Sequence, residues 1–156
     1  MKATASILVR APVEKIIGFV TDPDGYPKAD TKILKLTPLE QGEDWSRVRA
    51  RGYLRWPFLQ GAMTLYVQVR GTERVDIEAE PESFDMPTRL TVDSFVANFT
   101  FEPTGEGVIV SHTEDQRFKD TPLGRLAERL SSRWLADHLK REEMPRLKAI
   151  LESTSA

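Results

Sequence analysis

The sequence predicts an α+β fold in which a curved antiparallel β-sheet wraps around a long C-terminal α-helix. Strand-like segments follow one another from residue 33 to residue 118 without an intervening helix, which favours antiparallel pairing. A helical pattern then runs from residue 123 to residue 152. A helix of that length must bury its apolar stripe, and the concave face of a curved sheet is the available partner.

Each element has its own signal. A first strand over residues 3–10 ends at Ala11-Pro12, and two short helices follow, one over residues 12–21 and one beginning at Tyr26-Pro27. Thr121-Pro122 is a typical helix start, with threonine as the N-cap, and Pro145 predicts a kink inside the long helix. The further strands are expected over residues 33–40, 44–56, 63–70, 74–80, 90–103 and 108–118.

Composition limits the classes of function. The 156 residues, which suit a single domain over 1–156, carry a formal net charge of -2, which argues against a nucleic-acid surface. The chain has no cysteine, which excludes disulfides, thiolate nucleophiles and cysteine-based metal sites. No apolar run approaches the roughly 20 residues of a membrane span, and the N-terminal stretch lacks a signal-peptide pattern. We therefore expect a cytoplasmic protein without stable membrane insertion.

The strand VIVSHTEDQRF, residues 108–118, has no cleanly apolar face. Thr104-Gly105-Glu106-Gly107 predicts a hairpin with the preceding strand. An axis between Thr104 and Gly105 pairs Phe101 with Val108, Phe99 with Val110, Ala97 with His112, Phe95 with Glu114 and Asp93 with Gln116. The phenylalanine face must point inward, so His112, Glu114, Gln116 and Asp93 are predicted on the inner face.

Buried carboxylates and imidazoles are costly in a close-packed core, so a polar inner face favours a cavity between sheet and helix. The alternative is that the strand passes the rim of the sheet and these groups meet water. On the long helix, polar residues interrupt an apolar stripe that contains Leu130 and Trp134, with His138 beside it. We predict that the ligand-binding wall consists of Phe95, Phe99, Phe101, Val110, Gln116, Leu130, Trp134 and His138.

The stretches ASILVRAPVEKIIGFVTDPDGYPKA, NFTFEPTGEG and TPLGRLAERL…PRLKAILES together resemble the polyketide cyclase/dehydrase group of START-like proteins, with the SRPBCC or Bet v 1-like helix-grip fold. The resemblance covers nearly the whole chain. It implies a hydrophobic cavity between the sheet and the long helix. It carries over no catalytic residues, because the family has no universal catalytic motif.

Three functions follow as hypotheses. The first is binding of a hydrophobic small molecule, lipid-like or polyketide-like, without a cofactor. The second is a cofactor-independent cyclase, aromatase or dehydratase, with His112 as the acid/base and Glu114 or Asp93 as its orienting carboxylate. The third is a protein-interaction module, and a homodimer is compatible with each.

Three further features stay secondary. A metal site from Asp93, His112, Glu114 and His138 is disfavoured, because the strand positions are too far apart for a local chelate, so no metal is expected. The row Arg47, Arg49 and Arg51 is interpreted as a solvated strand face rather than a site for an acidic partner. The stretch WPFLQG, residues 56–61, is expected to be an apolar loop that forms a lid, a dimer contact or a membrane-touching tip.

Overall fold

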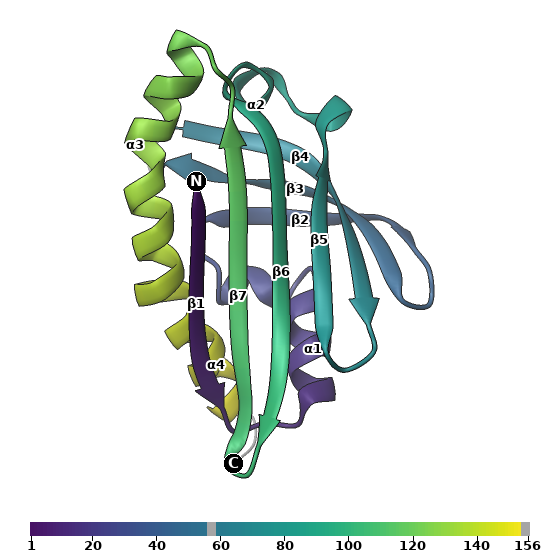
Figure 1. Cartoon of the computed structure of the whole chain (residues 1–156). Helices are drawn as coiled ribbons and strands as arrows, with labels where there is room; N and C mark the ends of the chain where they lie inside the picture. Colours follow the sequence, from purple (N-terminus) through teal and green to yellow (C-terminus); the bar gives the residue numbers. More distant parts are fainter. Residues whose placement is uncertain (56–58, 154–156) are drawn as a thin grey trace.

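In the computed structural model, which describes residues 1–55 and 59–153, seven antiparallel strands form one strongly curved sheet. The sheet runs in the order β1-β7-β6-β5-β4-β3-β2, and Figure 1 shows how it bends around the helices. The strands are β1 (Lys2–Val9), β2 (Ile33–Gln41), β3 (Trp45–Arg55), β4 (Leu59–Arg70), β5 (Arg74–Glu80), β6 (Val92–Thr104) and β7 (Gly107–Phe118).

The helices confirm the predicted order of elements except between β5 and β6, where two short helical segments interrupt the expected run of strands. Two short ones follow β1, and the long C-terminal helix lies alongside β1 at the open edge of the curved sheet (Figure 1). No helix among the described residues is long and apolar enough to cross a membrane. The helical segments are α1 (Val13–Thr21), η1 (Tyr26–Lys28), η2 (Pro81–Ser83), α2 (Met86–Thr91), α3 (Pro122–His138), the π-helical turn η3 (Leu139–Glu143) and α4 (Met144–Ser153).

The hairpin between β6 and β7 has the predicted inner face but a different register. Thr104 pairs with Gly107, so Phe101 lies opposite Val110 and Phe99 opposite His112, two residues from the predicted pairing. A shift of two residues keeps the side chains from Ser94 onward on their predicted faces, because strand side chains alternate with a period of two. The turn needs Gly107, whose φ is 153° and where a Cβ would lie 2.5 Å from the Val9 carbonyl oxygen.

The predicted start of β6 at residue 90 is wrong, because the short helix α2 occupies Met86–Thr91. Its N-cap is Asp85, whose side chain accepts a hydrogen bond from the Thr88 backbone N–H. The β6–β7 ladder then shifts register between Val92 and Ser94, and Asp93 is exposed at this irregularity. The prediction that Asp93 lies opposite Gln116 on the inner face is therefore wrong.

The long C-terminal helix is confirmed over residues 122–153, and its irregularity lies just before Pro145. In the turn η3 the Met144 N–H donates to the Leu139 carbonyl, five residues earlier. Proline has no N–H to give the carbonyl four residues before it, and its ring crowds that position. A widened turn at this point accommodates Pro145 without ending the helix, and it turns Glu143 into the core.

The face that α3 buries differs from the predicted one. Its buried residues are small or polar for the most part: Gly124, Ala127, Ser131, Leu135 and His138. Leu130, predicted to line the cavity, is 56% exposed on the flank of the helix. At Gly124 the absence of a side chain is required locally, because a Cβ would come within 2.1 Å of the Lys119 carbonyl oxygen in the segment that leads into the helix.

Residues 56–58 of the predicted apolar loop lie outside the described residues. The remainder of that stretch is strand, because β4 begins at Leu59. Two arginines of the row on β3 have nearby partners. Arg47 pairs with Glu40 and Glu80, and Arg49 donates to the Ser83 carbonyl.

Candidate functional site

A cavity of about 100 Å³ lies between the concave face of the sheet and α3. Most of its wall is apolar and comes from the middle of the sheet, while one end is formed by charged residues. The lining residues in the sheet include Ala50, Leu54, Met63, Leu65, Ile77, Phe95, Ala97, His112, Glu114 and Gln116; Tyr26, Asp30, Lys32 and Leu135 complete the site from outside it.

The polar strand β7 supplies three side chains to this cavity. His112, Glu114 and Gln116 are each at most 3% exposed, and alternate positions on one strand place all three on the inner face. The His112 ring stacks on Phe99, with ring centroids 3.9 Å apart. The predicted polar inner face is thus confirmed, and it is a cavity wall rather than a rim in water.

Lys32, from the segment between η1 and β2, holds the charged end together. Its ammonium lies 2.5 Å from Asp30 Oδ2, 2.7 Å from Glu114 Oε1 and 3.1 Å from Glu143 Oε2. We call Asp30, Lys32, His112, Glu114, Glu143 and His138 the buried charge cluster. Burial opposes the charged form of Lys32, but the surrounding carboxylates outweigh it and raise the pKa of Lys32 well above its usual value.

Glu143 links the helix to the strand. Its Oε1 lies 2.6 Å from His112 Nδ1 and accepts a 2.6 Å hydrogen bond from the Tyr26 hydroxyl. Burial disfavours the carboxylate, but the charges of Lys32 and His112 prevail and lower the pKa of Glu143 to about 2. An ionised Glu143 accepts hydrogen bonds only, so His112 Nδ1 must donate, and Nε2 is the ring nitrogen left without a hydrogen-bond partner.

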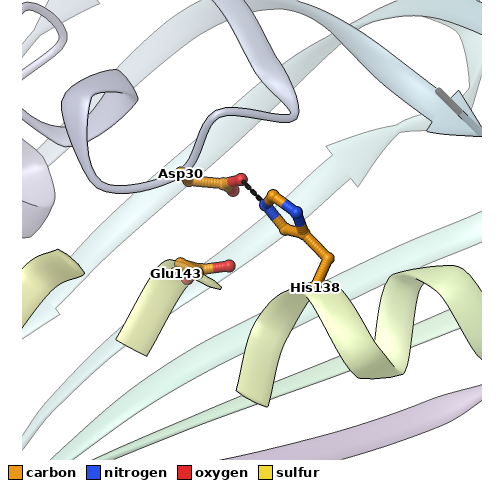
Figure 2. Close-up of side chains that lie close together, drawn as sticks. All are labelled: Asp30, His138 and Glu143. Carbon is orange, nitrogen blue, oxygen red and sulfur yellow. Dashed lines mark hydrogen bonds and ion pairs between the residues drawn. The ribbon is translucent and has the colours of Figure 1, made fainter. Parts of the chain in front are cut away.

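A second histidine closes the cluster on the helix side. His138 Nε2 lies 3.0 Å from Asp30 Oδ1, and its Nδ1 lies 3.6 Å from Glu142 at the surface. Figure 2 shows Asp30 reaching from its loop toward His138 at the end of α3, with Glu143 on the following turn. The cluster therefore ties the loop after η1, the strand β7 and the π-helical turn to one another.

The protonation of His112 depends on these neighbours. Burial alone would lower the pKa of His112, and Lys32 acts in the same direction. The charges of Glu143 and Glu114 and the hydrogen bond to Glu143 outweigh both, so the pKa of His112 is raised above its usual value. The Tyr26 hydroxyl, buried beside Glu143, keeps its proton, because burial and the nearby carboxylates raise its pKa well above 10.0.

Two buried polar atoms at the cavity lack a partner. Within residues 1–55 and 59–153, His112 Nε2 and Gln116 Nε2 make no hydrogen bond, although both residues line the cavity. His112 Nε2 has only Glu114 Oε1 at 4.0 Å. Buried polar atoms without partners are costly, so this pair is a natural place for a polar group of a bound molecule.

The carboxylates and imidazoles form two groups with ligand atoms within 4.8 Å: Asp30, His138 and Glu143, and His112, Glu114 and Glu143. Neither is the set considered from the sequence, since Asp93 lies elsewhere. The Lys32 ammonium contacts a carboxylate of each group and already supplies the compensating cation. A divalent ion beside this ammonium would be repelled by it, so the geometry favours an organic ligand.

Only some of the predicted site residues line the cavity. The residues that line the cavity are His112, Glu114, Gln116 and Phe95. His138 belongs to the buried charge cluster but does not line the cavity. Phe99, Phe101 and Val110 are buried in the core beside the cavity, so they support the wall and do not line it. Trp134 is half-buried under the Arg55 guanidinium, 5.8 Å from its ring centroid. Leu130 and Asp93 lie outside the site.

Sequence reasoning missed Tyr26, Asp30, Lys32 and Glu143. Only Glu143 had a detectable signal: it lies midway between Leu139 and Leu147, four residues from each, in a series that continues to Leu151 and marks a buried stripe. Asp30 and Lys32 sit in a polar loop that looks like ordinary surface. Their burial results from packing between distant segments.

The fold and cavity define a START-like helix-grip protein, with an apolar cavity between a curved sheet and a long helix. Residues 1–152 match the family "Polyketide cyclase / dehydrase and lipid transport", and the chain belongs to this family. A search of curated proteins finds no match.

Solved structures share the fold. A Thermus thermophilus protein superposes with a TM-score of 0.80 at 15% identity, covering 100% of both chains. The Zhui aromatase/cyclase of a Streptomyces species gives 0.75 at 12% identity, covering 100% of this chain and 96% of that one. A STAR-related lipid transfer protein of Xanthomonas axonopodis gives 0.72 at 11% identity, covering 96% and 84%. At these identities the likeness shows the fold alone.

Proposed function

We propose that this protein binds a hydrophobic small molecule, lipid-like or polyketide-like, in the cavity between the sheet and α3. The observation that carries the proposal is the pairing of an apolar wall with two unpartnered buried groups, His112 Nε2 and Gln116 Nε2. The apolar wall favours burial of a hydrocarbon skeleton, and the two polar atoms orient one polar group. Family membership and the lipid transfer protein among the structural neighbours support this reading.

The ligand's polar group is uncharged in this proposal. The buried charge cluster contains three carboxylates, and its three bases can at most balance them, so it offers no excess positive charge. An anion held at His112 and Gln116 would lose its water without gaining a counter-ion from the cluster. A carbonyl or hydroxyl oxygen, in contrast, satisfies the open positions at lower cost.

The size of the cavity limits how the ligand sits. About 100 Å³ is less than the roughly 300–1,000 Å³ of pockets that enclose drug-sized ligands. A polycyclic molecule therefore inserts one end, or displaces part of the wall. Leu135 is the residue through which α3 contributes to the cavity wall. The other buried residues of α3 are mostly small, so this side of the wall has little bulk.

Mass spectrometry of freshly purified protein tests the proposal, first under native conditions and then after denaturation and solvent extraction. We expect a stoichiometric apolar molecule with an uncharged polar group. Gln116→Met removes the open amide and should reduce its occupancy several-fold, while Ser131→Ala, which alters an unpartnered buried hydroxyl that does not line the cavity, should not. Empty protein that also ignores polycyclic and fatty probes would contradict binding and favour the protein-interaction alternative.

A second function has its own supporting observation. The Glu143–His112 pair holds one imidazole tautomer, with Nε2 available to a molecule in a mostly dry cavity. That is the arrangement of a general base whose carboxylate partner stabilises the imidazolium. A cofactor-independent cyclase, aromatase or dehydratase would use it to take a proton from the carbon beside a carbonyl group, leaving an enolate in the substrate and the proton on Nε2.

Deuterium exchange separates catalysis from binding. A bound carbonyl compound should gain deuterium at that carbon in heavy water with wild-type protein and lose this exchange with His112→Ala, provided the variant still binds it. Exchange should rise with pH through the pKa of His112, because only the neutral imidazole is a base. Equal exchange in both proteins would leave a binding role alone.

A further inference from the structure

The described surface exposes a group of large apolar side chains at one end of the molecule. Met86 and Leu90 on α2 are 64% and 48% exposed, and three leucines on α3 are about half exposed. We call Met86, Leu90, Leu123, Leu126 and Leu130 the α2–α3 apolar surface. Single exposed leucines are ordinary on proteins, but five from two adjoining helices are not.

The apolar residues share one side of each helix, and the two helices adjoin. On α3, Leu123, Leu126 and Leu130 have spacings of three and four, so they share one flank of the helix. On α2, Met86 and Leu90 are four apart and likewise share a side. The two helices pack against each other, and Figure 1 shows α2 beside the first turns of α3.

A row of arginines borders the leucines. Arg125, Arg129 and Arg133 repeat every four residues along the neighbouring flank of α3, and Arg89 is exposed on α2. Within the described part of the chain, Arg89 and Arg129 form no ion pair. Arg125 pairs with Asp120, and Arg133 lies 4.0 Å from Asp137. The positive charge is therefore only partly compensated locally.

The remaining acid on this helix faces away. Glu128 lies 3.7 Å from the chain's amino-terminal nitrogen, on the side of α3 toward β1. The whole chain carries a net charge of -2, so general electrostatics would repel an anionic partner. Attraction of an anionic partner to this end of the molecule therefore depends on the arginines that border the α2–α3 apolar surface.

We propose that the α2–α3 apolar surface docks peripherally on anionic phospholipid bilayers. Exposed leucines and methionine fit the boundary between headgroups and acyl chains, and bordering arginines reach lipid phosphates with their long side chains. Pairing of two copies through this surface would bring two sets of arginines into one interface, which charge repulsion disfavours. The inference is independent of ligand binding, because it needs no molecule in the cavity.

Vesicle co-flotation at low salt tests this docking. We expect wild-type protein to float with mixed phosphatidylcholine–phosphatidylglycerol vesicles and not with phosphatidylcholine alone, and to detach as salt rises. Arg89→Gln combined with Arg129→Gln should weaken binding by about five-fold for each arginine removed. Leu126→Ser combined with Leu130→Ser should weaken it at least as much, since both side chains lose their apolar contact.

The matched control is Leu39→Ser, which alters an equally exposed leucine on the edge strand β2, away from the surface. Its binding should equal that of wild type. Absence of wild-type flotation with the anionic vesicles would overturn the proposal, as would binding that the surface variants leave unchanged. A dimer in sedimentation analysis that Leu126→Ser and Leu130→Ser dissociate would also overturn it, because a second copy would then cover the surface.

Discussion

The two halves of the C-terminal helix bury different kinds of residue. α4 packs Met144, Leu147 and Leu151 against the core, all at most 2% exposed. α3 buries small residues and leaves its leucines on the flank. The difference shows that the two segments of this helix pack in different ways. Its last turns close the core with bulk, and its first turns cover a cavity at close range, with the buried charge cluster at their junction.

The largest expected effect lies at that junction. Glu143→Gln leaves Lys32 and His112 buried without their shared carboxylate, and breaking a buried ion pair typically costs about 3–5 kcal/mol. Urea unfolding should show this loss. Glu152→Gln, which alters a more exposed carboxylate paired with Lys148, should cause a much smaller change. An unchanged midpoint for Glu143→Gln would mean that the cluster does not stabilise the fold.

The next effect tests the packing of α4. Leu147→Ala removes a fully buried side chain from the core and should lower the free energy of unfolding by about 2–5 kcal/mol. The same urea experiment measures it. A loss below about 1 kcal/mol would show that this end of the helix is not closed by close packing.

The cluster also predicts a dependence of stability on acid. The pKa of Glu143 is lowered to about 2 in the folded chain from an ordinary value of 4.5. The unfolded chain therefore binds the extra proton first, and stability is lost as pH falls from about 4.5 toward 2. One such group contributes a slope of up to about 1.4 kcal/mol per pH unit. Unfolding curves across this range should show the slope, and Glu143→Gln should reduce it.

The smallest expected loss of stability is for an exposed leucine of α3, and it contrasts most clearly with the loss expected for α4. Leu130→Ala removes the same number of atoms as Leu147→Ala, but from an exposed flank, and should change the free energy of unfolding by less than about 0.5 kcal/mol. Thermal unfolding of the two variants side by side measures the difference. Similar losses would remove the distinction between the two halves.

His112 adds a trend of the opposite sign to that of Glu143. Its pKa is raised in the folded chain, so its contribution is complete below its unfolded pKa and is lost as pH rises through the folded one. The buried charge cluster thus loses stability both at low pH, through Glu143, and at high pH, through His112.

The cytoplasmic location and the possible homodimer stay predictions.

Much of the fold was determined by the sequence itself. Alternation in β3–β7 and the helical period after Thr121 are local patterns, so they fix element types and the inner face of His112, Glu114 and Gln116. The family resemblance of the first and last stretches also predicted how the sheet and the long helix are arranged. Even the two-residue error in the hairpin kept that inner face, because a two-residue slip preserves alternation.

The site needed the tertiary structure. Lys32 and Glu143 are 111 positions apart in the sequence, and nothing local marks either as the partner of the other. Helical period alone selected Leu130 as inward, because it weighs apolar size and not how closely two elements approach. Only the packed chain decides that Gly124, Ala127 and Ser131 face the sheet, and that the burial of Asp30, Lys32 and Glu143 is offset by their mutual contacts.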